Sequence, residues 1–172
     1  MSRRSAEAIT ITRARKSEVA AASAIAEEAA RWLAATGREM WGPEDYSPEA
    51  LRPSIEAGEL YLAKINGEPV GMMVLQWEDP LYWPDVPAGE SAFVHRLAVK
   101  RSVAGKGVSY ALLDWAKRAA RQAGRKYLRL DCDPERPRLC AFYESAGFAR
   151  HSVRAVEGYP VVRYQLVLDI SQ

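Results

Sequence analysis

The hydrophobic pattern of the first third of the chain changes from a strand period to a helix period. Residues 8–13 alternate isoleucine with threonine, which predicts a β-strand. After Ser17 the apolar residues recur at steps of three and four, which predicts an amphipathic helix that ends at Gly37. These apolar positions are Val19, Ala22, Ala26, Ala29 and Leu33. A second helix is predicted over residues 47–58, with Pro48 in its first turn.

The middle of the chain has the pattern of a β-hairpin followed by a long loop. Residues 60–64 and 68–77 flank Asn66-Gly67, the dipeptide best suited to a type I′ turn. Residues 79–89 contain three prolines and are predicted to form a loop. Apolar alternation resumes in residues 91–100, which predicts a further strand.

The last third of the chain alternates between helix and strand patterns. Helices are predicted over residues 108–123 and 137–147, separated by a strand over residues 126–132. Two more strands, over residues 148–156 and 161–169, close the chain around a Glu-Gly turn. This order of elements predicts a mixed α/β fold.

Length and composition are typical of a globular protein. The chain has 172 residues, of which 27% are charged and 48% are hydrophobic, the balance of one folded domain. We therefore predict a single domain over residues 1–172. The 24 lysines and arginines nearly balance the 22 aspartates and glutamates, so the net charge of +2 predicts neither a nucleic-acid nor a membrane partner.

Cysteine usage and the start of the chain bear on the cellular compartment. Cys132 and Cys140 lack the spacing of a metal site, and no metal is predicted. Met1–Arg4 is basic, but no apolar core of a signal sequence follows it. The longest apolar runs, such as residues 70–75, are too short to cross a bilayer. We therefore expect a cytoplasmic protein.

The segment that says most about function joins a strand, a loop and a helix. It runs from Phe93 to Leu113 and carries Gly105 and Gly107 in the loop before the helix. Glycines at such a junction let successive main-chain N–H groups converge beside the positive end of a helix, an arrangement that suits a phosphate. The spacing is neither that of a Walker loop nor that of a dinucleotide fingerprint, and a tight turn explains the two glycines more simply.

A second segment changes this interpretation. Residues 142–148 read F-Y-E-S-A-G-F and lie in the predicted short helix and the turn that follows it. Together the two segments resemble the GNAT superfamily of N-acetyltransferases, in which a G-x-G loop cradles the pyrophosphate of acetyl-CoA and an F-Y-E-x-x-G-F signature follows on a later helix. The resemblance is firm from Phe93 to Phe148, and the earlier elements follow the order of the family.

The resemblance implies a fold and a cofactor. The fold is α/β, with a mixed, mostly antiparallel sheet that splays open between its fourth and fifth strands and is flanked by about four helices. The cofactor is acetyl-CoA. The main chain of Leu97, Ala98 and Val99 would contact the pantetheine arm. The pyrophosphate would lie against a run of loop and helix residues: Gly105, Lys106, Gly107, Val108, Ser109 and Tyr110.

Two positions depart from the pattern of the family. Ser102 stands where the loop usually begins with Gln or Arg, and Arg136 stands where an Asn often touches the cofactor. Neither change affects the main-chain cradle. Arg136 remains a candidate contact to the cofactor.

The resemblance also suggests catalytic residues. Tyr143 matches the family tyrosine that faces the sulfur, so it is a candidate cofactor contact, and its phenol can give a proton to the leaving thiolate. Many relatives carry a carboxylate where this chain has His95, and an imidazole with an ordinary pKa near 6.5 can accept the proton of an ammonium group. A half-buried structural histidine fits the strand pattern nearly as well. Glu90 is the reserve base.

Aromatic and acidic residues fall in regions that line the acceptor cleft of relatives. Trp32, Trp41, Tyr46 and Trp83 predict an apolar or aromatic acceptor, although core packing is the simpler explanation for Trp32. Glu44, Asp45, Asp79 and Asp85 can attract an amine, but acidic loop residues are usually just solvated and none receives a firm role.

These observations lead to one principal hypothesis and three alternatives. We predict a transferase of the N-acetyltransferase type that moves the acetyl group of acetyl-CoA to a primary amine of a small molecule, by direct attack in a ternary complex. The alternatives are a protein or peptide acetyltransferase, an acyltransferase that uses another donor such as aminoacyl-tRNA, and a non-catalytic module that binds coenzyme A. A basic group at residues 118–126 raises the RNA alternative, although a charged helix face explains it better. Homodimers are common among relatives, so a homodimer is also considered.

Overall fold

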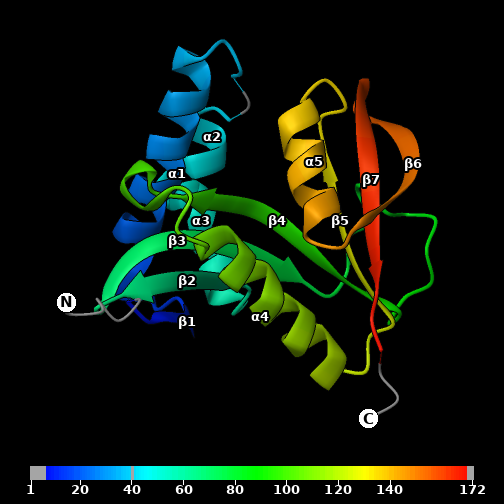
Figure 1. Cartoon of the computed structure of the whole chain (residues 1–172), viewed down its shortest axis with the longest axis horizontal. Coiled ribbons are helices and arrows are strands. Elements are labelled where there is room, and N and C mark those ends of the chain that lie inside the picture. Colours follow the sequence, from blue (N-terminus) through cyan, green and yellow to red (C-terminus); the bar gives the residue numbers. More distant parts are fainter. Residues whose placement is uncertain (1–6, 40, 170–172) are drawn as a thin grey trace, which may run out of the picture. The chain divides into compact units, whose positions relative to one another are not determined.

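The structure is a computed structural model that describes residues 7–39 and 41–169 (Figure 1). The basic start of the chain, Met1–Arg4, lies outside the described residues. Contacts divide the chain into two compact units. Unit 1 comprises Met1–Val74 and Arg96–Leu112, and unit 2 comprises Leu75–His95 and Leu113–Gln172.

The described residues form a mixed set of strands and helices. The strands are β1 (Ile9–Arg13), β2 (Leu60–Ile65), β3 (Glu68–Gln76), β4 (Ser91–Val99), β5 (Tyr127–Cys132), β6 (Ala149–Val156) and β7 (Tyr159–Val167). The α-helices are α1 (Val19–Ala35), α2 (Pro43–Tyr46), α3 (Pro48–Glu56), α4 (Val108–Gln122) and α5 (Pro137–Ser145). Hydrogen bonding orders the strands β1-β2-β3-β4-β5-β7-β6, and β4 contributes residues to both units. The predicted mixed α/β fold is confirmed.

Local sequence signals account for most of the element ends, with two differences. Ser47 caps α3 as expected, because its Oγ accepts a hydrogen bond from the Ala50 N–H at 3.2 Å. Ser17 does not cap α1 as expected; it lies inside a short 3₁₀ turn, Lys16–Glu18, that precedes the helix. The single-turn helix α2, which begins at Pro43, was also not expected. Among the described helices, none combines the length and the apolar character needed to cross a bilayer.

Unit 1 contains an antiparallel sheet of β1, β2 and β3. Ile9 pairs with Ile65 at one end of the β1–β2 ladder, and Arg13 pairs with Tyr61 at the other. The hairpin between β2 and β3 turns at Asn66 and Gly67, whose φ angles of 52° and 79° are those of the expected type I′ turn. The predicted hairpin is therefore confirmed.

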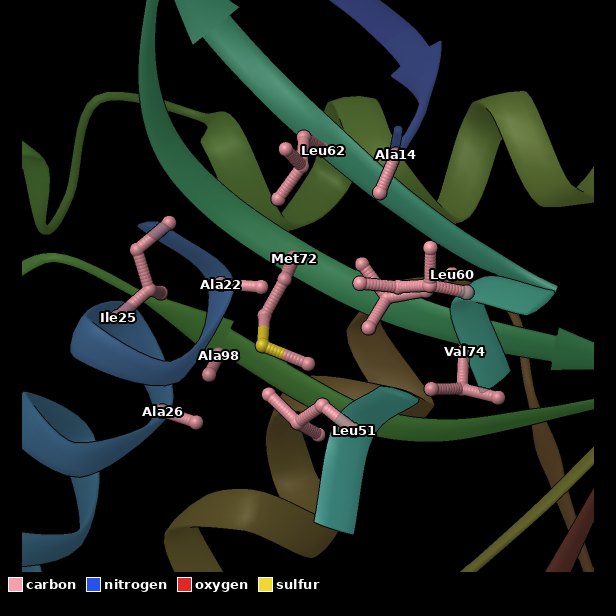
Figure 2. Close-up of a cluster of buried hydrophobic side chains, with 11 residues drawn as sticks. Ala14, Ala22, Ile25, Ala26, Leu51, Leu60, Leu62, Met72, Val74 and Ala98 are labelled. Atoms are coloured by element: carbon pink, nitrogen blue, oxygen red, sulfur yellow. The ribbon is translucent and has the colours of Figure 1, made fainter. Parts of the chain in front are cut away.

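One face of this sheet is covered by α1 and α3 through a cluster of apolar side chains (Figure 2). Small residues on α1 allow this helix to approach the sheet closely. Leu51 of α3 is fully buried in the same cluster as Met72. The labelled members of the cluster are Ala14, Ala22, Ile25, Ala26, Leu51, Leu60, Leu62, Met72, Val74 and Ala98. The alanine-rich face predicted for α1 is thus the face that packs on the sheet.

The opposite face of the sheet meets the start of α4. A methyl group added at Gly71 would lie 2.9 Å from Val108 and 3.3 Å from Leu112, so only glycine permits this approach. Met72, the next residue, faces α1 and α3 because side chains alternate along a strand. The sheet is therefore packed on one face by α1 and α3 and on the other by the start of α4. This packing fixes the position of the loop that leads into α4.

Unit 2 contains the first part of β4 together with β5, β6 and β7. β4 and β5 run parallel and pair over three positions, from Ser91 with Tyr127 to Phe93 with Arg129. β5 pairs with β7, and β6 pairs with β7, both antiparallel. The β4–β5 ladder ends at Phe93 although β4 continues to Val99 and β5 to Cys132. This early end is the splay expected between the fourth and fifth strands.

Candidate active site

The glycine loop of unit 1 has the geometry of a phosphate cradle. Gly105 and Gly107 have φ angles of 77° and 84°, which side-chain-bearing residues adopt rarely. A methyl group added at either glycine would meet no atom within 4 Å, so open space lies beside both residues. Val103 and Val108 are buried and anchor the two ends of the loop. Main-chain N–H groups at the start of a helix point toward the preceding loop, an arrangement that suits an anion.

The second half of β4 leads into this loop and contains a strained residue. Arg96 has a φ of 51°, which is costly for a non-glycine residue inside a strand. Its guanidinium donates a hydrogen bond to the carbonyl oxygen of Asp45 at 2.5 Å. Beyond it, Ala98 is buried in the core cluster while Leu97 and Val99 are half-buried. Arg96 was not predicted as a site residue, because no pattern in the neighbouring sequence indicates a positive φ at an arginine.

Three of the aromatic residues predicted to line the acceptor cleft lie in unit 1. Trp32 keeps 37% of its surface exposed and carries the guanidinium of Arg101 over its ring at 3.8 Å. It is therefore not the core residue that its helical position suggested. Trp41 and Tyr46 are partly buried and pack against the core cluster.

The fourth of these residues, Trp83, lies in unit 2 and is only 2% exposed. Its ring centroid lies 5.0 Å from the guanidinium carbon of Arg129 and 4.4 Å from that of Arg163. The ring also faces Phe93 and His151. This packing gives Trp83 a structural role and leaves little of its surface for a ligand.

His95 lies between two carboxylates in unit 2. Its Nε2 lies 2.9 Å from Oδ2 of Asp79, and its Nδ1 lies 3.9 Å from Oδ1 of Asp131. Asp79 belongs to the loop before β4, whereas Asp131 continues the register of β5 beside His95. The Tyr82 ring is 5.7 Å from the imidazole, centroid to centroid. Neither Asp131 nor Tyr82 was predicted for the site, because only the fold brings β5 and this loop to His95.

Burial decides the electrostatics of this cluster. The side chain of Asp79 is 4% exposed, that of Asp131 12% and that of His95 19%. Desolvation by burial raises the pKa of Asp131 from 3.8 to about 6, opposed by His95 and reinforced by the charge of Asp79. The other oxygen of Asp79 accepts a hydrogen bond from the Tyr82 N–H at 3.1 Å, which orients the carboxylate.

Tyr143 is held firmly within unit 2. It lies on α5, is 7% exposed, and its ring faces those of Phe148 and Tyr164 at 6.1 Å and 6.3 Å. Burial raises the pKa of the Tyr143 phenol above its ordinary value, so the hydroxyl stays protonated at neutral pH. The Nζ of Lys117 on α4 donates to the carbonyl of Ala146 at 2.7 Å and fixes the end of α5.

Two other predicted residues have ionic partners in unit 2. Glu90 lies 3.6 Å from the Arg129 guanidinium, and it is separated from His95 by about 16 Å of extended strand. It therefore does not join the His95 cluster. Arg136 precedes α5 and lies 3.4 Å from the carboxylate of Asp133, with 12% of its side chain exposed.

The two cysteines meet at the end of β5. Both are free thiols, and their sulfur atoms lie 3.6 Å apart. Burial raises the pKa of the Cys132 thiol, which makes it a weak nucleophile.

The order of the strands, the early end of the β4–β5 ladder and the glycine loop before α4 define the acetyltransferase class of α/β proteins. Comparison with known proteins agrees with this assignment. The profile of the Acetyltransferase (GNAT) family matches residues 26–148, a stretch that includes segments of both units. The chain therefore belongs to the GNAT acetyltransferase family, as its resemblance indicated.

Individual relatives give the same result. The chain is 30% identical over 126 residues to the uncharacterized N-acetyltransferase YesJ of Bacillus subtilis (strain 168), with 69% of each chain covered. Its fold is similar to that of a GNAT family acetyltransferase from Listeria monocytogenes 4b F2365, with a TM-score of 0.80, 22% identity, and 93% and 95% of the two chains covered.

Two further solved structures contain coenzyme A. The PaiA N-acetyltransferase from Thermoplasma acidophilum, in complex with coenzyme A, matches with a TM-score of 0.73 and 18% identity over 93% of this chain and 99% of that chain. AAC(6′)-Ib, in complex with ribostamycin and coenzyme A, matches with a TM-score of 0.67 and 20% identity over 94% of each chain.

Proposed function

We propose that this protein is an acetyl-CoA-dependent N-acetyltransferase that acetylates a primary amine of a small molecule by direct attack in a ternary complex. Membership of the GNAT family supports the reaction class. The single observation that carries the proposal is His95, a half-buried imidazole between two carboxylates on a strand that leads into a glycine cradle. A module that only binds coenzyme A has no need of such a group.

The residues present fit the cofactor. Gly105 and Gly107 have the backbone angles and the open space that a pyrophosphate against the loop requires. The main chain of residues 97–99 would hold the pantetheine arm, and the N–H groups from Gly105 to Tyr110 would hold the phosphates. The N–H of Lys106 is the exception, because it donates to the carbonyl oxygen of Val103 at 3.1 Å. Bound acetyl-CoA supplies an acetyl thioester: the amine nitrogen bonds to the carbonyl carbon, the C–S bond breaks, and the sulfur leaves as a thiolate.

Two side chains handle the protons. His95 accepts one proton from the acceptor ammonium and so exposes the nitrogen lone pair. Tyr143 gives its phenolic proton to the sulfur, and the second proton of the amine nitrogen restores the phenol through solvent. The raised pKa of Tyr143 keeps that proton in place before the reaction.

The aromatic residues Trp32, Trp41 and Tyr46 and one structural neighbour support a small-molecule acceptor. AAC(6′)-Ib holds ribostamycin, a small molecule, together with coenzyme A.

The first test measures ligand-dependent stability. The unfolding temperature is recorded with acetyl-CoA, with coenzyme A and with neither, because a ligand at 100 times its Kd stabilises the folded state by about 2.7 kcal/mol. We expect a clear upward shift with both ligands. No shift, together with no binding by calorimetry, would contradict the cofactor assignment.

The second test addresses the acid. Tyr143→Phe should lower kcat by about 100-fold when chemistry limits the rate, because the thiolate loses its proton donor. The affinity for coenzyme A should remain within about twofold. Tyr159→Phe, which changes a tyrosine that is 75% exposed in the same unit, serves as the matched control and should leave kcat unchanged. Equal turnover of the two variants would remove Tyr143 from this role.

A further inference from the structure

Three buried polar atoms around His95 form no well-aligned hydrogen bond with the residues that the structure describes. They are Oδ2 of Asp79, Nε2 of His95 and Oδ1 of Asp131, and none completes a hydrogen bond within the described part of the chain. The ligand-capable atoms of these residues all lie within 4.8 Å of one another. Oδ2 of Asp79 and Nε2 of His95 lie 2.9 Å apart and partly satisfy each other, whereas Oδ1 of Asp131 has no polar contact that short among the described residues. Because buried polar groups are nearly always paired, Oδ1 of Asp131 indicates a missing partner.

The charge of the cluster indicates a cationic partner. Two carboxylates face one imidazole, and the Arg163 guanidinium, whose charge partly opposes the burial that raises the pKa of Asp131, is itself bound to Asp85 through two contacts of 2.6 Å and 3.0 Å. A positive charge placed beside a desolvated carboxylate such as that of Asp131 stabilises its ionised form.

The distances specify how such a cation would bind. Asp79 approaches Nε2, which favours the imidazole tautomer with its proton on Nε2 and leaves Nδ1 as an acceptor. Nδ1 and Oδ1 of Asp131 are 3.9 Å apart, too far for a direct hydrogen bond. A single ammonium nitrogen at about 2.8 Å from each atom fits between them and donates to both.

We infer that Asp79, His95 and Asp131 form the ammonium site of the acceptor, and that this site selects alkylammonium substrates that carry no carboxylate beside the amine. This inference rests on the proposed function and names its substrate class. Asp131 binds the ammonium directly. Asp79 acts through His95, as a positioning residue that sets its tautomer and stabilises the imidazolium after proton transfer.

Selectivity follows from the same charges. An acceptor with a carboxylate on the carbon next to nitrogen would bring a third negative charge beside those of Asp79 and Asp131. Like-charge contacts of this kind strongly disfavour a ligand. The amine formed by removing the carboxylate of an amino acid would bind, whereas its parent amino acid would not.

Matched pairs of acceptors test this selectivity. Tyramine is compared with tyrosine, tryptamine with tryptophan, and phenethylamine with phenylalanine, each by kcat/KM with acetyl-CoA. We expect the amine to exceed its parent by about 100-fold in at least one pair. Asp131→Asn and Asp79→Asn should reduce that ratio to below about tenfold, while Asp114→Asn, which removes an exposed charge on α4, should leave it unchanged.

Binding without turnover is followed by NMR. The chain has two histidines, so the signals of His95 are assigned with His95→Gln and His151 serves as an internal control. Without any cofactor, tyramine should shift the His95 imidazole signals and tyrosine should not. Asp79→Asn should change the nitrogen shifts that report the His95 tautomer, an effect that a merely structural role would not produce.

Several results would overturn the inference. One is a kcat/KM ratio of amine to parent amino acid that is near one in every pair. Another is a ratio that neither Asp131→Asn nor Asp79→Asn changes. If acetylation continues in either case, the proposed function would stand without the ammonium site. A third is that Zn²⁺ shifts the His95 signals while no amine does, which would make the cluster a metal site. A failure of acetyl-CoA to bind, with tyramine still shifting His95, would instead reject the proposed function and keep the ammonium site.

Discussion

The interiors of the two units differ in chemistry. The core of unit 1 is built from leucine, isoleucine, valine, methionine and alanine side chains, with Ser23 as its buried polar residue. The interior of unit 2 contains Arg129 and Arg163, each 4% exposed, together with Asp79 and Ser91. Apolar burial is non-directional and stabilises the fold, whereas buried charges are costly but hold their partners in fixed positions.

The charged interior of unit 2 shows how this positioning is achieved. Arg129 donates to Ser91 on β4 and to Gln165 on β7, and Arg163 binds Asp85 in the loop before β4. The Trp83 ring packs against both guanidinium groups. These contacts fix the loop that presents Asp79 to His95. Both units bury apolar side chains, but unit 2 also buries charged groups, whose desolvation costs free energy and whose contacts orient ionisable side chains.

The largest expected effect is in the apolar core of unit 1. Leu51→Ala should destabilise the protein by about 4 kcal/mol, because Leu51 is fully buried and the cavity cannot collapse between α3 and the sheet. The loss, measured by urea denaturation, should not depend on salt. Leu81→Ala, at a residue that is 49% exposed, is the control and should change stability by less than about 0.5 kcal/mol. A small loss in the free energy of unfolding for Leu51→Ala would contradict the stabilising role of this apolar core.

The next effect has the opposite sign and depends on pH. The pKa of Asp131 is raised from 3.8 to about 6 in the folded state, so its ionisation destabilises the fold progressively as the pH rises through that range. Asp131→Asn should therefore stabilise the protein above pH 6, by up to about 3 kcal/mol, and have little effect below pH 4.

Denaturation at pH 4 and at pH 8 measures this difference. Asp114→Asn, at an exposed position on α4, controls for the lost charge. If Asp131→Asn destabilised the protein at pH 8, neighbouring groups would stabilise the Asp131 carboxylate by more than its desolvation costs. Buried charge in unit 2 would then stabilise the fold, as apolar burial does in unit 1. A variant that is more stable yet less active would sharpen the contrast between the two interiors.

The smallest of the three effects concerns a buried guanidinium. Arg129→Met keeps an unbranched apolar stem but removes the guanidinium and its hydrogen bonds to Ser91 and Gln165. The change should cost about 2 kcal/mol, because relief of desolvation offsets part of the lost contacts. Arg118→Met on the exposed face of α4 is the control. A loss larger than that of Leu51→Ala would mean that charge, rather than apolar burial, dominates stability.

Much of the fold follows from local patterns. Asn66-Gly67 specified its hairpin because few other dipeptides accept two positive φ angles, and Ser47-Pro48 specified the start of α3. The short helix α2 and the 3₁₀ turn at Ser17 were not predicted correctly, because single turns carry too few residues for a hydrophobic period. The aromatic residues were the least well interpreted: Trp83 is buried and Trp32 is half-exposed, and burial is a property of the packed fold.

By itself, the sequence determined the class of protein, the glycine loop and the candidates Tyr143 and His95, because each depends on residues close together in the chain. Only the tertiary structure decided what surrounds His95. Asp79 lies in a proline-rich loop and Asp131 on a strand that pairs with β4, so their charges meet the imidazole only after β4 and β5 are aligned. The pKa of Asp131, the orientation of the imidazole and the proposed choice of acceptor follow from this contact, which no local pattern records.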